Sequence, residues 1–187
     1  MDVEKTIKNL EARHFKVQHF ATGAEAVAYV CAATHNTTVG IGGREITGAH
    51  RITVAADLAD TEWNVDSDFD AVVLPGGMPG TLNLEASPLV QAAVDAAASR
   101  GKLLCAICAA PTVLGHKGLL SGKRAVCFPG MEEGLVGAKV VANPVVRDGN
   151  IITAAGAGTA IDFGLAIAAY FTSAEAAGKL RVTMQCR

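Results

Sequence analysis

Short apolar runs alternate along the chain with longer segments in which apolar residues recur at helical spacing. Strands are predicted at 70–74 and 103–107, and residues 71–74 and 103–107 are continuously apolar, which is typical of strands buried on both faces of a sheet. Other strands are predicted at 15–20, 37–41, 124–128, 138–141, 145–147 and 151–154. Helices are predicted at 2–14, 23–34, 87–99 and 160–171, with short ones after Pro111 and Ser173. This alternation predicts an α/β fold in which helices cover both faces of a mostly parallel sheet, with an extra N-terminal helix.

Turn residues set the boundaries of several of these elements. Ser87 is suited to cap a helix, Pro88 to occupy its first position, and Gly101 to follow its end. The pair at 148–149, Asp-Gly, predicts a hairpin between two short strands. Residues 44–60 predict an excursion at the edge of the sheet that contains a further strand.

Cys108 follows the buried run at 103–107 and precedes Pro111, which suits the first turn of a helix. The cysteine is therefore predicted to lie on the sharp turn between a central strand and a helix, like a nucleophile elbow. The first N–H groups of that helix are expected to point toward the sulfur and to favour the thiolate. The small residues around Cys108 would let the backbone pack closely there.

Composition narrows the class of protein. The chain has 187 residues, enough for one domain, which we take as residues 1–187. Its net charge of −2, without a basic cluster, argues against nucleic acid or an anionic membrane as a partner. No apolar run approaches the roughly 18 residues of a membrane span, and the charged N-terminus does not resemble a signal peptide. Five irregularly spaced cysteines predict a reduced, cytoplasmic protein.

Three glycine-rich or cysteine-bearing segments follow predicted strands: 75–77, Cys108 and 156–159. Since ligands of parallel α/β sheets bind at the carboxyl ends of the strands, one pocket could contain all three. The segment 156–159, Gly-Ala-Gly-Thr, superficially resembles a nucleotide loop, but it lacks a third glycine and a lysine. We interpret it as a tight turn at the start of a helix, and we predict neither a cofactor nor a metal.

Three motifs in this order resemble the ThiJ/PfpI superfamily: LPGG at 74–77, AICAAP at 106–111 and TAAGAGTAIDFGLAI at 153–167. The branch that they resemble includes the parkinsonism-associated deglycase and its bacterial relatives, and the resemblance covers residues 38–180. It implies a flavodoxin-like three-layer α/β/α sandwich, a homodimer and a reactive cysteine at Cys108. The backbone donors near the thiolate in the family would fall on Gly76, Gly77 and Ala109.

The chain departs from the family pattern in two places. A peptidase of this superfamily has histidine after the cysteine, whereas this chain has Ala109, so peptidase activity is not expected. The glutamate that contacts the cysteine in the deglycase branch would fall on Ala28, which leaves Glu25 as the candidate acid. Glu25 is alternatively an ordinary charge in the first turn of a helix. His50 lies either beside the pocket, where the family often has a polar residue, or in a solvated loop.

The first 43 residues are atypical of the superfamily. The stretch LEARHFKVQHFATGAEAVAYV, followed by TVGIGG, is similar to the start of lactate-utilisation-type (LUD) domains. This similarity predicts a natural fusion or an engineered chimera of two Rossmann-like fragments, joined near residues 38–43. Such an exchange would account for both the extra helix and the missing glutamate.

Three functions remain open from the sequence. The first is an enzyme in which Cys108 attacks glyoxal or methylglyoxal and releases a hydroxy acid. The second is a redox-sensing or protective protein oxidised at Cys108, and the third is a scaffold without activity. A disulfide between Cys105 and Cys108 is disfavoured, because strand alternation would point the two side chains to opposite faces. Cys31 and Cys127 are interpreted as core residues, and His116 as a solvated or capping residue at a helix end.

Overall fold

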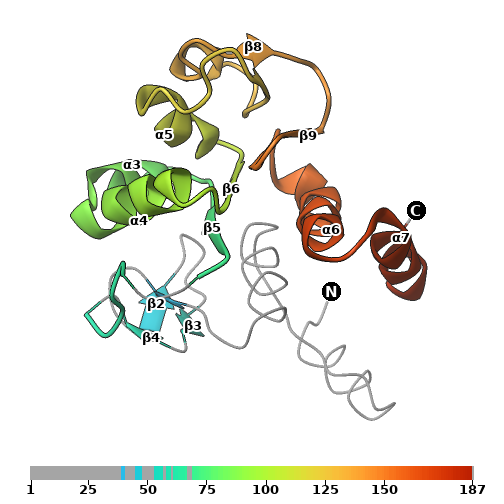
Figure 1. Cartoon of the computed structure of the whole chain (residues 1–187), viewed down its shortest axis with the longest axis horizontal. Helices are drawn as coiled ribbons and strands as arrows, with labels where there is room; N and C mark the ends of the chain where they lie inside the picture. The colour runs from blue at the N-terminus through green and yellow to red at the C-terminus, as the bar shows by residue number, and fades with distance from the viewer. Residues whose placement is uncertain are drawn as a thin grey trace.

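The computed structural model describes residues 39–40, 45–47, 53–56, 58–59, 61–66 and 69–186. The helices predicted at 2–14 and 23–34 and the strand predicted at 15–20 lie outside these residues. The elements below carry the labels of Figure 1.

The central sheet has the strand order β5-β6-β10-β9. Its strands are β5 (Ala71–Leu74), β6 (Leu103–Ile107), β10 (Ile151–Ala154) and β9 (Val145–Asp148). The first three run parallel, and β9 pairs antiparallel with β10. The mostly parallel sheet and the alternation of strands and helices, both expected from the sequence for a flavodoxin-like fold, are therefore confirmed. Because β6 lies between two parallel neighbours, Cys108 follows a central strand.

Helices cover both faces of this sheet (Figure 1). One face carries α3 (Gly80–Ala86), α4 (Pro88–Ser99) and α5 (Pro111–His116). The other face carries α6 (Ala160–Phe171), against which α7 (Ala174–Thr183) packs. Arg181 of α7 forms an ion pair with Asp162 of α6. Residues 80–86, for which no element was predicted, form the helix α3.

The packing of β6 on both of its faces explains why residues 103–107 are all apolar. Leu103, Cys105 and Ile107 pack with Phe163 of α6. The alternate residues of β6, Leu104 and Ala106, belong to the cluster on the other side, together with residues of α4 and α5. Both faces of the strand are thus covered, and every residue of β6 is buried.

Smaller elements complete the described chain. They are β1 (Val39–Gly40), β2 (Glu45–Thr47), β3 (Thr53–Ala55), β4 (Leu58–Ala59), β7 (Arg124–Ala125), β8 (Lys139–Val140) and the short 3-10 helices η1 (Glu132–Gly134) and η2 (Ala157–Thr159). β2 and β3 pair antiparallel within the predicted edge excursion, and β9 and β10 form the hairpin predicted at 148–149.

The strand predicted at 124–128 is shorter than expected, since β7 ends at Ala125. The next N–H group, that of Val126, donates to the side-chain Oγ1 of Thr153 at 3.0 Å and not to a strand backbone. The N–H of Phe128 donates to the carbonyl of Cys108 at 2.8 Å. Residues 126–128 therefore leave the regular ladder and approach the cysteine turn.

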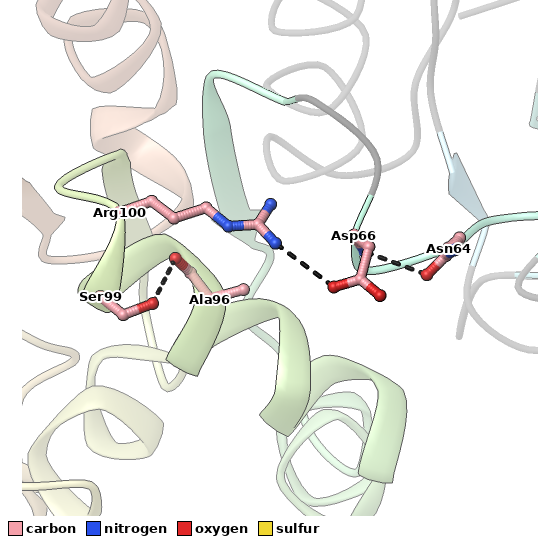
Figure 2. Close-up of polar contacts among 5 residues, drawn as sticks. All are labelled: Asn64, Asp66, Ala96, Ser99 and Arg100. Carbon is pink, nitrogen blue, oxygen red and sulfur yellow. Dashed lines mark hydrogen bonds and ion pairs between the residues drawn. The ribbon is translucent and has the colours of Figure 1, made fainter.

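Asp66 links residues 61–66 to the end of α4 (Figure 2). The Nη2 of Arg100 lies 3.5 Å from Oδ1 of Asp66, and the Asp66 N–H donates to Oδ1 of Asn64 at 3.0 Å. The Arg100 guanidinium also lies over the ring of Phe69. Because the Asp66 carboxylate is largely exposed, the ion pair itself contributes little to stability.

Ser87→Ala should lower the free energy of unfolding by about 1 kcal/mol. The Ser87 hydroxyl accepts a hydrogen bond from the N–H of Val90 at 3.4 Å, and alanine leaves that N–H without this acceptor. Urea unfolding measures the change. Ser99→Ala is the matched control at the other end of α4, where the hydroxyl only donates to the Ala96 carbonyl (Figure 2). An equal loss in both variants would contradict the capping role.

Candidate functional site

Cys108 lies on the turn between β6 and α5, as predicted, and its backbone is left-handed with φ of 64°. A side chain other than glycine costs about 1–2 kcal/mol in this conformation. Two hydrogen bonds hold the strained residue in place. Its N–H donates to the Ala154 carbonyl at 2.9 Å, and its carbonyl accepts from the N–H of Phe128 at 2.8 Å. The side chain is half-buried, so the surrounding structure fixes the turn and leaves part of the residue exposed.

Gly76 approaches this turn so closely that no side chain fits there. A Cβ atom on Gly76 would lie 2.5 Å from Cβ of Cys108 and 2.5 Å from the carbonyl oxygen of Ile107. It would also lie 3.2 Å from the backbone nitrogen of Ala109. The structure thus brings together three of the residues singled out from the sequence: Gly76, Cys108 and Ala109.

Gly77 continues the same loop in a left-handed conformation, with φ of 92°. Its carbonyl accepts hydrogen bonds from both the N–H and the hydroxyl of Thr81, at 2.8 and 2.9 Å. Within the described ranges, no hydrogen bond uses the N–H groups of Gly76, Gly77 or Ala109. These three residues lie on the two loops that meet at Cys108.

The start of α5 offers fewer free N–H groups than the sequence predicts. Pro111 has no N–H group, and the N–H groups of Ala110, Thr112 and Val113 donate to the carbonyls of Ile107, Ala109 and Ala110. The prediction that the first N–H groups of this helix point toward the sulfur is therefore wrong for these residues. These N–H groups bond within the turn because only Ala109 and Ala110 separate Cys108 from α5.

Segment 156–159 forms the tight turn that was predicted at the start of α6. The Thr159 hydroxyl donates to the Gly156 carbonyl at 2.8 Å, within the turn itself. A Cβ on Gly156 would lie 3.5 Å from the ring of Phe128, whose N–H donates to Cys108. The third glycine-rich segment therefore borders the cysteine turn through Phe128.

The other described cysteines occupy different environments. Cys105 is fully buried within β6. Cys108 packs against the same cluster as Cys105, because the left-handed turn ends the strand alternation that was expected to separate them. Cys127 is buried, as predicted, and its thiol donates to the Phe128 carbonyl at 3.4 Å. Burial, the carboxylate of Glu132 and the charge of Cys108, in decreasing order, raise the pKa of Cys127 from 9.0 to about 11.

The sequence predicted Cys127 as a core residue, but it did not indicate that the next residue, Phe128, lies against the backbone of Cys108. One signal was available, since the run at 124–128 is the next predicted strand after Cys108 and could end at the same edge. His116, at the end of α5, is exposed and pairs with Glu85 of α3, which agrees with a surface role.

Several predicted residues lie outside the described part of the chain: Glu25, Ala28, Cys31 and His50. Among the described residues, no three His, Cys, Asp or Glu side chains are grouped as a metal ion would require. None of the helices in these ranges has the length and apolar character of a membrane span.

The sequence model of the DJ-1/PfpI family matches residues 31–170. Drosophila melanogaster protein dj-1beta is 38% identical over 172 residues, an alignment that covers 87% of this chain and 89% of the relative. A Pyrococcus abyssi deglycase is 41% identical over 113 residues, covering 58% of this chain and 65% of the relative.

Solved structures show the same similarity. The crystal structure of Drosophila DJ-1beta superposes with a TM-score of 0.77 and 33% identity, covering 90% of this chain and 95% of the other. A cysteine-to-alanine mutant of a DJ-1 superfamily protein from Salmonella typhimurium superposes with a TM-score of 0.79 and 32% identity, covering 87% and 91%.

Proposed function

Because the chain belongs to the DJ-1/PfpI family, we propose that it acts on small reactive carbonyls, such as glyoxal and methylglyoxal, with Cys108 as the nucleophile. The observation that carries this proposal is the contact between the two loops, in which Gly76 lies against Cys108. This approach supports a role for backbone donors near Cys108, which is half-buried and lies on a strained turn. The deglycase name of the Pyrococcus relative supports the same class of substrate.

The proposed reaction begins when the Cys108 thiolate attacks the aldehyde carbon of methylglyoxal. The new C–S bond gives a hemithioacetal, and the N–H groups of Gly76, Gly77 and Ala109 stabilise the oxygen that becomes negative. A proton then moves from the former aldehyde carbon to the neighbouring carbon, whose carbonyl becomes a hydroxyl. This transfer leaves a thioester, which water hydrolyses to lactate and the free thiol. Overall, one water adds to one methylglyoxal, so no external oxidant is needed.

The acid that moves the proton is proposed to be Glu25, the carboxylate that remains in the family pattern. The pocket residue His50 and the homodimer implied by the resemblance are also proposals, as is the cytoplasmic location. The exchange of residues 1–43 for a LUD-type fragment is a further proposal. The alignment with dj-1beta weighs against a complete exchange, because it omits fewer residues than that segment contains.

Cys108→Ala should reduce methylglyoxal consumption and lactate formation to the uncatalysed rate. The variant removes the only atom that forms the covalent bond to substrate in this mechanism. Cys105→Ala is the matched control, since Cys105 lies in the interior of β6 and takes no part in the reaction. Lactate is measured over time with equal concentrations of each protein. Equal rates for the wild type and Cys108→Ala would exclude Cys108 as the nucleophile.

A second candidate function is redox sensing through Cys108. Its side chain is half-buried, whereas Cys105 and Cys127 are buried, so a peroxide reaches Cys108 more readily than either of them. Mild peroxide treatment followed by mass spectrometry tests this candidate. Oxidation of another cysteine before Cys108, including the half-buried Cys186, would contradict it.

A further inference from the structure

Phe128 carries a large, exposed apolar side chain next to the cysteine turn. Its N–H donates to the carbonyl of Cys108 at 2.8 Å, so its backbone lies directly against that residue. Its side chain is 48% exposed. Single exposed apolar residues are common on protein surfaces and need no explanation by themselves. The position of the ring relative to the Cys108 side chain therefore decides whether the ring has a function.

The two core clusters place Phe128 and Cys108 on the same face of the sheet. Ala125 and Cys127 both belong to the cluster on the side of α4 and α5, as alternate residues of an extended segment would. The same alternation directs Phe128 to the opposite face, which α6 covers. The Cys108 side chain packs against the cluster on that α6 face. Phe128 and Cys108 therefore share a face, whereas Cys127 points to the other one.

The contact between Phe128 and Gly156 supports this placement independently. A Cβ on Gly156 would lie 3.5 Å from Cδ2 and 3.9 Å from Cε2 of Phe128, so one edge of the ring faces that glycine. Gly156 lies between Ala154 and Ala160, which both belong to the cluster on the α6 face. The Ala154 carbonyl also accepts the N–H of Cys108 at 2.9 Å. The Phe128 ring and the cysteine turn therefore border the same end of β10.

We propose that the Phe128 ring lines one side of the substrate site and makes the protein selective for α-oxoaldehydes that carry an aryl group, as phenylglyoxal does, in place of the methyl group of methylglyoxal. This inference rests on the function proposed above and names its substrate class. Two aromatic rings attract each other in offset or edge-to-face arrangements. The phenyl group of phenylglyoxal is bonded to the ketone carbon, next to the aldehyde carbon that Cys108 attacks, so it stays close to the cysteine turn throughout the reaction.

The reaction of phenylglyoxal balances in the same way as that of methylglyoxal. The Cys108 thiolate forms a C–S bond with the aldehyde carbon, and the carbonyl oxygen takes the negative charge and then a proton. A proton moves from this carbon to the former ketone carbon, which leaves a thioester. Water hydrolyses the thioester to mandelate and the free thiol. One water adds to one phenylglyoxal, so no oxidant or reductant is needed.

Two α-bromoketones test the role of the ring without turnover. Phenacyl bromide and bromoacetone differ only in a phenyl or a methyl group, and with each the Cys108 thiolate forms a C–S bond to the CH2 group as bromide leaves. Fragmentation of the tryptic peptide 103–117 locates the label on Cys108. The ratio of the two rates, divided by the same ratio for glutathione, should be about five in the wild type. A value near one would overturn the proposal.

Variants at Phe128 separate selectivity from packing. Phe128→Ala should lower the normalised ratio about fivefold, whereas Phe128→Tyr, which keeps a ring, should retain it. Both variants keep the N–H that donates to Cys108. A ring that only packs on Gly156 would change both rates together, so an unchanged ratio in folded Phe128→Ala would overturn the proposal. The wild-type ratio remains decisive if that variant does not fold. Val140→Ala is the matched control, because Val140 is equally exposed, at 48%, but lies in β8.

Turnover distinguishes this inference from the proposed function on which it rests. The kcat/KM for phenylglyoxal, measured as mandelate, divided by that for methylglyoxal, measured as lactate, should fall about fivefold in Phe128→Ala. Turnover of both substrates with the same quotient in the wild type and in Phe128→Ala would overturn the role of Phe128. Absence of both products, together with the expected alkylation ratios, would refute the carbonyl reaction and still support the aryl-selective side of the site.

Discussion

Replacing Gly76 with alanine should lower the free energy of unfolding by about 3 kcal/mol and slow the alkylation of Cys108 at least about tenfold. The added methyl group would lie 2.5 Å from both Cβ of Cys108 and the carbonyl oxygen of Ile107. A backbone carbonyl cannot rotate away as a flexible side chain can, so the two loops must separate. The expected loss of stability is at the upper end of the usual cost of overpacking. The same separation would remove Gly76 from the position in which its N–H can serve Cys108.

Iodoacetamide labelling of Cys108, located by fragmentation of the tryptic peptide 103–117 that also contains Cys105, measures the change in reactivity of Gly76→Ala, and urea unfolding measures its change in stability. Gly80→Ala is the matched control, since Gly80 begins α3 a few residues away and a Cβ there meets nothing within 4 Å. That control should label at the wild-type rate and lose no stability. Normal labelling of a folded Gly76→Ala protein would show that the contact between the loops does not govern the reactivity of Cys108.

Gly115→Ala should be similarly destabilising, by about 3 kcal/mol, although alanine is the better helix former. Gly115 lies in α5, and a Cβ there would overlap the carbonyl oxygen of Gly134 and lie 2.9 Å from Cα of Leu135. All of these are backbone atoms of η1 and its C-cap. The gain in helix propensity is only about 1 kcal/mol, so the steric cost decides the sign.

Thermal unfolding provides the measurement for Gly115→Ala, with an expected decrease in Tm of about 6–12 °C. Gly178→Ala is its control, because Gly178 also lies within a helix, α7, but a Cβ there meets nothing within 4 Å. The control should gain up to about 1 kcal/mol. A stabilising Gly115→Ala would mean that η1 moves away from α5 at little cost.

Most of the fold between residues 70 and 183 follows from local sequence patterns. The continuous apolar run at 103–107 forms a strand with both faces covered, and Ser87 and Ser173 cap the helices that they were predicted to begin. One exception, the shortened strand at 124–128, is informative. The residues at 124–128 have a high propensity for strand structure. The N–H groups of Val126 and Phe128, however, donate to Thr153 and Cys108, which are distant in the sequence, so the strand ends at Ala125.

The sequence by itself determined the sheet, its main helices and the location of Cys108 between a strand and a helix, since these depend on hydrophobic periodicity and on capping residues close together in the chain. Only the tertiary structure decided which groups surround that cysteine. The close approach of Gly76 and the hydrogen bond from Phe128 to Cys108 both depend on backbone segments that are distant in the sequence. Periodicity places a side chain on a face, but close packing between distant segments determines which atoms it meets there.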